Sequence, residues 1–153
     1  DEIGTLQRSL NKMADTIVET IDQHIFEKKK LEATLESISD GIAMIDSAKR
    51  ILISNKSFSE LLNISIETRD KPYFEVIRNR TINSKIEKGL SSGEKDSFEV
   101  ESINERFFEA VINPIKADGE IIQGILFVIH DISERKKIER IKSDLVSNVS
   151  LEL

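Results

Sequence analysis

The sequence of 153 residues contains no cysteine and no tryptophan, and it has one tyrosine, two prolines and six glycines. The absence of cysteine excludes disulfide frameworks, thiolate zinc sites and cysteine nucleophiles. The longest nearly apolar run, residues 121–129, is interrupted by Gln123 and is too short to cross about 30 Å of hydrocarbon. Acidic residues outnumber basic ones by 28 to 22, and the resulting net charge of −6 argues against neutralisation of nucleic-acid phosphates. We therefore expect a chain that spans no membrane and binds no nucleic acid.

The few glycines and prolines divide the chain into three parts. None occurs between Gly4 and Gly41, and none occurs after Gly124. Because these residues most often interrupt helices, two long helices are expected to flank a turn-rich middle part.

The first part has the apolar spacing of a coiled coil. Apolar residues recur at intervals of three and four, namely Ile3, Leu6, Leu10, Met13 and Ile17. This narrow stripe is typical of a helix that pairs with another helix. Ile21 follows after a second interval of four, a stutter that locally unwinds a supercoil. His24 and Lys28 then occupy stripe positions where a partner expects apolar residues, so pairing should be weakest there. A solvated helix without a partner is the alternative.

The middle part has the shorter periods of an α+β domain. Apolar alternation predicts strands at 41–45, 50–54, 97–103, 106–115 and 121–129. Helical segments are expected between the second and third strands, at 55–62, 73–77 and 81–90. Asp118-Gly119 is typical of a hairpin between the last two strands. The phenylalanines at 58, 74, 98, 108 and 127 are expected to be core residues rather than a ligand cage.

The last part again has a narrow apolar stripe, formed by Ile138, Ile141, Leu145, Val149 and Leu153. At its start, Asp131 or Ser133 can accept hydrogen bonds from the first free N–H groups and so fix the angle at which the helix leaves the sheet. A helix cap without a signalling role is the alternative. The basic run at 135–137 has acidic neighbours and is expected to be a solvated helix face.

These segments, in this order, resemble a bacterial sensor histidine kinase. The start, Asp1-Glu2-Ile3-Gly4 followed by Leu6, Leu10, Asn11 and Met13, resembles the second helix of a HAMP domain. The middle is similar to a PAS domain of the PhoR and WalK kinases, with the landmarks Asp40-Gly41-Ile42, Ile53-Ser54-Asn55 and Asp118-Gly119. Asp131-Ile132-Ser133 resembles the Asp-Ile-Thr motif at which a PAS sheet passes into its output helix. Residues 147–153 resemble the start of the phosphoacceptor box.

The resemblance implies a fold and a division into domains. The fold is α+β, a five-stranded antiparallel sheet with helices on one face, flanked by long coiled-coil helices at both ends. Residues 1–21 would be the second half of HAMP, 22–36 a coiled-coil linker helix and 37–131 the PAS domain. Residues 132–153 would be the output helix and the start of the dimerisation and phosphoacceptor helix.

Position 151 departs from the family. Leu151 stands where the family has its phosphorylated histidine, and leucine has no atom that accepts phosphate. The sequence also contains no ATP-binding domain, so no catalysis is expected of this chain, and ATP and magnesium are expected as cofactors of a parent kinase alone. Position 151 is about 200° from the neighbouring stripe residues on a helix, so its side chain is expected to face water.

The resemblance also implies candidate metal ligands at Asp40, His130 and Glu134. Some WalK-like PAS domains bind a metal at these positions together with a histidine, but this chain has Ser37 where that histidine would be. The alternative is that no metal binds here. In that case His130 simply ends a strand, and Glu134 lies near the N-terminus of a helix, where the helix dipole favours its negative charge. The core offers no axial histidine for haem and no cysteine for a photoactive flavin. Binding of an apolar metabolite in the core is not excluded by the sequence.

The predicted function is transmission of a signal by the cytoplasmic portion of a membrane-bound sensor histidine kinase. Two chains would pair in parallel, and helix movement arriving through HAMP would pass through PAS to the phosphoacceptor helix, eased between Ile17 and Ile21 and at His24 and Lys28. The expected partners are a second copy and, for the parent, a response regulator; the transmembrane segments would lie outside this sequence. A PAS module that senses a ligand or a metal is the alternative. An enzyme is not expected, because no phosphate-binding glycine loop or paired nucleophile and base is found.

Overall fold

The computed structural model describes residues 1–102 and 105–152, and the side chains of these residues up to position 148. The chain forms two compact units, Asp1–Ser37 and Ile38–Leu153. Within the described residues, neither long helix is apolar enough to cross a membrane.

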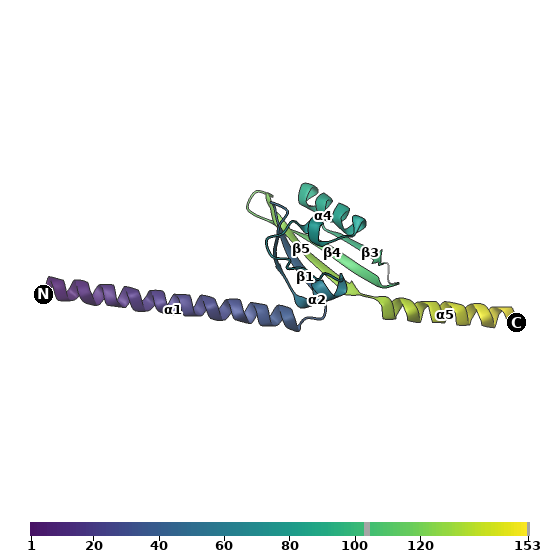
Figure 1. Ribbon diagram of the computed structural model, residues 1–153, viewed down its shortest axis with the longest axis horizontal. Coiled ribbons are helices and arrows are strands. Elements are labelled where there is room, and N and C mark those ends of the chain that lie inside the picture. The colour runs from purple at the N-terminus through teal and green to yellow at the C-terminus, as the bar shows by residue number, and fades with distance from the viewer. Residues whose placement is uncertain (103–104, 153) are drawn as a thin grey trace. The chain divides into compact units, whose positions relative to one another are not determined.

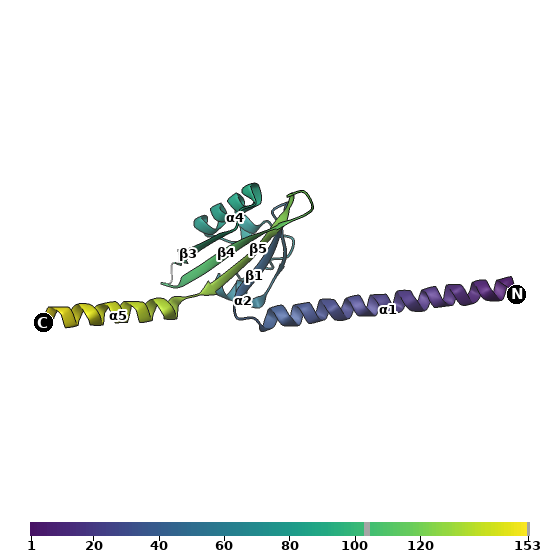
Figure 2. The ribbon, with the colours of Figure 1, turned by 180° about the vertical axis from the view of Figure 1, so that it is seen from behind.

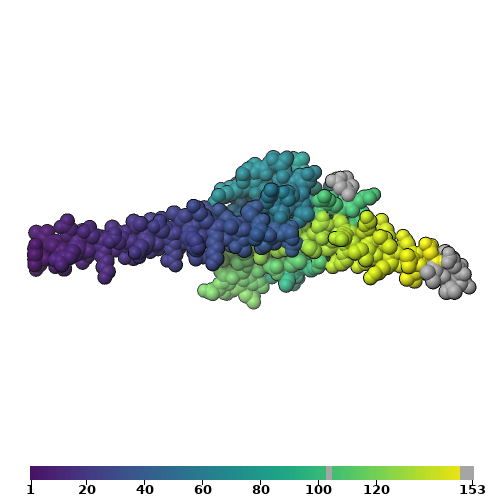
Figure 3. Space-filling model, turned by 90° about the horizontal axis from the view of Figure 1, so that it is seen from below, coloured from purple at the N-terminus to yellow at the C-terminus, as the bar shows by residue number. Residues whose placement is uncertain are grey.

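The first unit is one long helix, α1 (Glu2–Ser37), with no buried residue (Figure 1). At about 1.5 Å per residue it is about 54 Å long, and it forms a slender rod (Figure 3). The predicted stripe is exposed along its length, and each of its members Ile3, Leu6, Leu10, Met13, Ile17 and Ile21 is more than half exposed. The predicted helix is confirmed, and it ends at Ser37.

The second unit is built on a five-stranded antiparallel sheet in the order β2-β1-β5-β4-β3. Its strands are β1 (Gly41–Asp46), β2 (Ile51–Ser54), β3 (Asp96–Glu101), β4 (Phe107–Lys116) and β5 (Ile122–Asp131). The predicted sheet and its last hairpin are confirmed. The strand β5 runs two residues beyond the predicted end and includes His130 and Asp131. The end of the predicted strand 97–103 falls at a position outside the described residues.

Three helices connect β2 to β3: α2 (Lys56–Leu61), α3 (Tyr73–Val76) and α4 (Arg80–Ser92). The helix α2 packs on β1, and α4 packs across β3, β4 and β5 (Figures 1 and 2). Side chains of Asn55 and Asn79 cap α2 and α4 by accepting hydrogen bonds from backbone N–H groups. Gly93, with a φ of 70°, ends α4 in the left-handed conformation that favours glycine.

The core lies between these helices and one face of the sheet. Alternate strand residues point into it, and those fully buried from β1, β4 and β5 include Ala43, Ile45, Ala110, Ile112, Ile125, Phe127 and Ile129. Gly89 lets α4 approach the sheet closely, because a Cβ there would lie 2.9 Å from side-chain atoms of Ile112 and Ile125. Phe58, Phe108 and Phe127 are buried as predicted, but Phe74 on α3 is 51% exposed, so its assignment to the core was wrong.

The strand β5 leads through Ile132 into α5 (Ser133–Glu152), which confirms the predicted second helix. Its stripe residues Ile138, Ile141 and Leu145 are exposed. The predicted outward orientation of Leu151 concerns a side chain outside the described residues.

Candidate signal-coupling site and cavity

Hydrogen bonds connect the junction between β5 and α5 to Phe107, the first residue of β4. The N–H of Ile132 donates to the carbonyl of Phe107 at 2.8 Å, and the N–H of Phe107 donates to the Ser133 hydroxyl at 2.9 Å. The side chain of Ile132 is buried. Both backbone groups of Phe107 therefore hold the start of α5.

Asp131 supplies the cap expected at this junction. Its carboxylate accepts a hydrogen bond from the N–H of Ser133 at 2.8 Å. Partial burial raises the pKa of the Asp131 carboxyl, but hydrogen bonds from Ser133 and the nearby charge of Arg106 outweigh this effect, so the pKa lies below its ordinary value. The hydroxyl of Ser133 also accepts a hydrogen bond from the N–H of Phe107 on β4, so Ser133 connects both Asp131 and β4 to the start of α5. Their role in signalling stays a prediction.

Charged side chains form a second link between α5 and the sheet. The ammonium group of Lys136 lies 2.9 Å from a carboxylate oxygen of Glu99 on β3, and this contact raises the pKa of Lys136. The guanidinium of Arg135 lies 3.8 Å from oxygens of both Glu99 and Glu109. The basic face is exposed at Arg135 and Lys137, as expected, whereas Lys136 is partly buried; Arg135 and Lys136 also lie close to carboxylates of the sheet.

Asp40 and His130 are in direct contact, with Oδ1 and Nδ1 2.6 Å apart. They join the residue before β1 to the penultimate residue of β5. Across the described part of the chain, no group of three or more His, Cys, Asp or Glu residues could hold a metal ion. Ser37 adds no nitrogen ligand, so Asp40, His130 and Glu134 do not fit the metal set that the resemblance implied.

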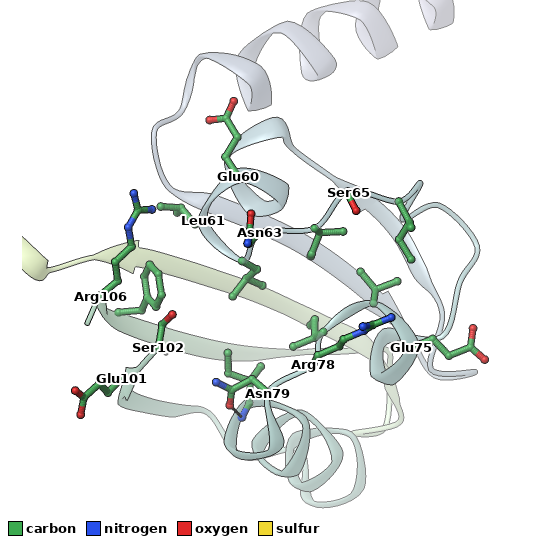
Figure 4. A pocket seen from close by; sticks show the side chains of 17 residues that line it. Glu60, Leu61, Asn63, Ser65, Glu75, Arg78, Asn79, Glu101, Ser102 and Arg106 are labelled. Carbon is green, nitrogen blue, oxygen red and sulfur yellow. Dashed lines mark hydrogen bonds between the residues drawn. The ribbon is translucent and has the colours of Figure 1, made fainter. Parts of the chain in front are cut away.

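A cavity of about 700 Å³ lies between α2, α3, the start of α4 and the β3–β4 hairpin (Figure 4). Its apolar wall includes Leu62, Ile64, Val76, Ile77, Ile82 and Phe108. Arg78 and Arg106 also line it and lie at opposite ends in Figure 4. No pattern in the sequence distinguished these two arginines from ordinary surface residues.

The remaining coupling candidates, Ile17, Ile21, His24 and Lys28, lie on α1 in the other unit. Ile17 and Ile21 are exposed there. Their role also stays a prediction.

Comparison with known proteins assigns the second unit. The family model described as PAS fold matches residues 29–132. This chain belongs to the PAS family. Over its whole length the chain is also similar, at 28% identity, to the sensor protein kinase WalK of Staphylococcus epidermidis, and it spans a quarter of that relative's length. The predicted resemblance to WalK-type sensor kinases is thus confirmed.

Solved structures agree with the assignment. The PAS domain of the histidine kinase ThkA superposes with a TM-score of 0.52 at 20% identity and covers 60% of this chain and 99% of that one. The PAS domain of Bordetella pertussis BvgS gives a TM-score of 0.55 at 16% identity, with 80% and 98% covered. Both likenesses show the PAS fold. The predicted boundaries at 21 and 36, which separate HAMP and linker, stay predictions.

At its junction with α5, this PAS domain has contacts that the sequence did not indicate. Phe107 acts through its backbone, which carries no residue-specific signal. Glu99 is 37 positions from Lys136, and only the sheet register brings the two together.

Proposed function

We propose that this chain is the signal-transmitting segment of a two-component sensor histidine kinase. It would receive helix movement through a HAMP-derived segment at 1–21 and a linker at 22–36. The PAS domain would pass this movement, modified by its own state, to the output helix that begins at 132. The chain itself carries out no phosphoryl transfer in this proposal.

The observation that carries the proposal is the pair of uncovered apolar stripes on the two helices that flank the PAS domain. On α1 and α5 the stripe residues are about half exposed or more, although their spacing is that of a coiled-coil seam. Burial of such a stripe against a second copy would remove it from water. The similarity to WalK extends over both helices as well as the PAS domain, which supports the same arrangement.

The parent protein would supply what this segment lacks. It would contribute the ATP-binding domain with ATP and magnesium, a partner response regulator and transmembrane segments. The chain would then lie on the cytoplasmic side of the membrane and pair in parallel with its own copy.

Transmission requires a seam with two arrangements that differ by only a few kcal/mol. The stutter between Ile17 and Ile21 and the polar stripe residues His24 and Lys28 make the α1 seam weakest in its middle. The junction at Phe107 then makes any displacement of the β4–β5 hairpin a displacement of the start of α5.

The test combines the oligomeric state with a change in the weak seam. Sedimentation equilibrium of the whole chain should show a reversible dimer, and His24→Leu with Lys28→Leu should tighten it about tenfold or more, because two apolar side chains join the seam. The control is Asp22→Leu with Lys29→Leu, which adds the same side chains on the far side of the helix and should leave the affinity unchanged. A chain that stays monomeric, or two double variants of equal affinity, would overturn the proposal.

A second candidate function is ligand sensing by the PAS domain itself. The cavity of about 700 Å³ favours it, since pockets of roughly 300–1,000 Å³ are typical of small-molecule sites. Metal sensing has less support, because no third metal ligand lies with Asp40 and His130 among the described residues.

A further inference from the structure

The cavity joins an apolar interior to positively charged ends. Val76, Ile77, Ile82 and Phe108 form buried parts of its wall. An occupant must therefore present an apolar body to this wall, because an unpaired polar group placed there would lose its hydrogen bonds to water.

The two arginines of the cavity are exposed and have no hydrogen-bonded partner within the described chain. Neither the guanidinium of Arg78 nor that of Arg106 forms a hydrogen bond or an ion pair with any described residue. The glutamates of the lining are Glu60, Glu75 and Glu101, and their carboxylates point away from the cavity (Figure 4). With these glutamates turned outward, Arg78 and Arg106 are the charged residues of the lining that can donate hydrogen bonds to an acidic group.

Arg106 is also the residue next to the junction with α5. Its neighbour Phe107 binds Ile132 and Ser133 through both backbone groups. Its charge acts on the carboxylate of Asp131, which caps α5. Arg78 lies at the other end of the cavity and has no such connection.

We propose that the cavity binds a small organic carboxylate with an apolar body, that Arg106 holds its carboxylate, and that occupancy loosens the start of α5. This inference rests on the ligand-sensing candidate of the proposed function and names its ligand class and its route to the output helix. A bound carboxylate draws Arg106 away from Asp131 and neutralises it. Because Phe107 adjoins Arg106, this displacement shifts the backbone groups of Phe107 that bind Ile132 and Ser133, and the first turn of α5 opens more often.

Binding is tested by calorimetry on the whole chain with octanoate and with octanamide, which has the same length but no charge. Octanoate should bind at least about tenfold more tightly, since a hydrogen bond to a charged group is about 1.5–3 kcal/mol more favourable than none. Arg106→Gln should abolish this preference. The matched control Arg78→Gln removes the same charge from the other end of the same cavity and should change octanoate affinity less than about threefold.

The route is tested by amide hydrogen exchange at residues 132–136. Saturating octanoate should speed exchange there in the unsubstituted chain and in Arg78→Gln, and should leave it unchanged in Arg106→Gln. Absence of octanoate binding, equal binding of octanamide, or a larger loss in Arg78→Gln than in Arg106→Gln would overturn the ligand class. Binding without a change in exchange would overturn the route. None of these results bears on dimer formation, which sedimentation without ligand decides separately.

Discussion

Asn55 should be the most sensitive polar residue of the PAS domain. It is 2% exposed and joins three segments through hydrogen bonds. Its Oδ1 accepts from the N–H of Ile42 at 2.9 Å and from the N–H of Phe58 at 3.0 Å, and its Nδ2 donates to the carbonyl of Asp40 at 2.8 Å. Asn55→Ala would leave these three backbone groups without that partner.

The expected loss follows from these contacts. The helix cap contributes about 1 kcal/mol to the free energy of unfolding, and each of the other two hydrogen bonds contributes about 1 kcal/mol. Asn55→Ala should therefore cost about 3 kcal/mol. Asn79→Ala is the matched control, because Asn79 caps α4 through a bond to the N–H of Ile82 and is less buried. It should cost about 1 kcal/mol.

Urea unfolding followed by tyrosine fluorescence measures both losses. Tyr73 is the only tyrosine, the chain has no tryptophan, and the side chain is buried in the PAS core, so the signal reports this unit and not α1. With a slope of about 1–3 kcal/mol/M, a loss of 3 kcal/mol lowers the urea midpoint by about 1–3 M. Equal losses in the two variants, to within about 0.5 kcal/mol, would refute the view that Asn55 does more than cap a helix.

Two further predictions concern the last helix. Glu99→Lys should speed hydrogen exchange at the start of α5 because it places like charges together, and adding Lys136→Glu should restore slow exchange; failure of the restored pair to recover would show that this ion pair does not position α5. Leu151→His, placed in a longer chain that includes an ATP-binding domain, should accept phosphate from labelled ATP, whereas no labelling would show that position 151 is not the phosphoacceptor site.

The secondary structure could be predicted because the relevant signals are local. Alternation in β4 separates the buried Phe108, Ala110 and Ile112 from their half-exposed neighbours, and this pattern is visible in the sequence. Turn residues such as Gly93 and Asp118-Gly119 mark the ends of the elements for a similarly local reason. The prediction that Phe74 is a core residue was wrong, because a short helix can turn one aromatic side chain outward while its neighbour, here Tyr73, is buried.

The coupling contacts could be predicted only in part because they are not local. The cap by Asp131 involves a residue two positions away and was expected. The bonds of Phe107 depend on pairing of β4 with β5, and the link between Glu99 and Lys136 depends on two strand registers at once. The contact of Asp40 with His130 joins residues 90 positions apart. Only the family resemblance, which implied both residues as metal ligands, placed them together; their spacing in the sequence did not.

The positions of three consecutive residues explain how this PAS domain could join sensing to output over a very short distance. Side chains alternate in an extended chain, so Arg106 and Phe108 turn towards the cavity while the backbone between them, at Phe107, binds the start of α5. The peptide bonds on either side of Phe107 are planar and stiff. A ligand that shifts the backbone at Arg106 or Phe108 also shifts the carbonyl and the N–H of Phe107, and these are the two groups that hold Ile132 and Ser133. No long chain of coupled side chains is needed, because the cavity wall and the anchor of the output helix are the same stretch of backbone.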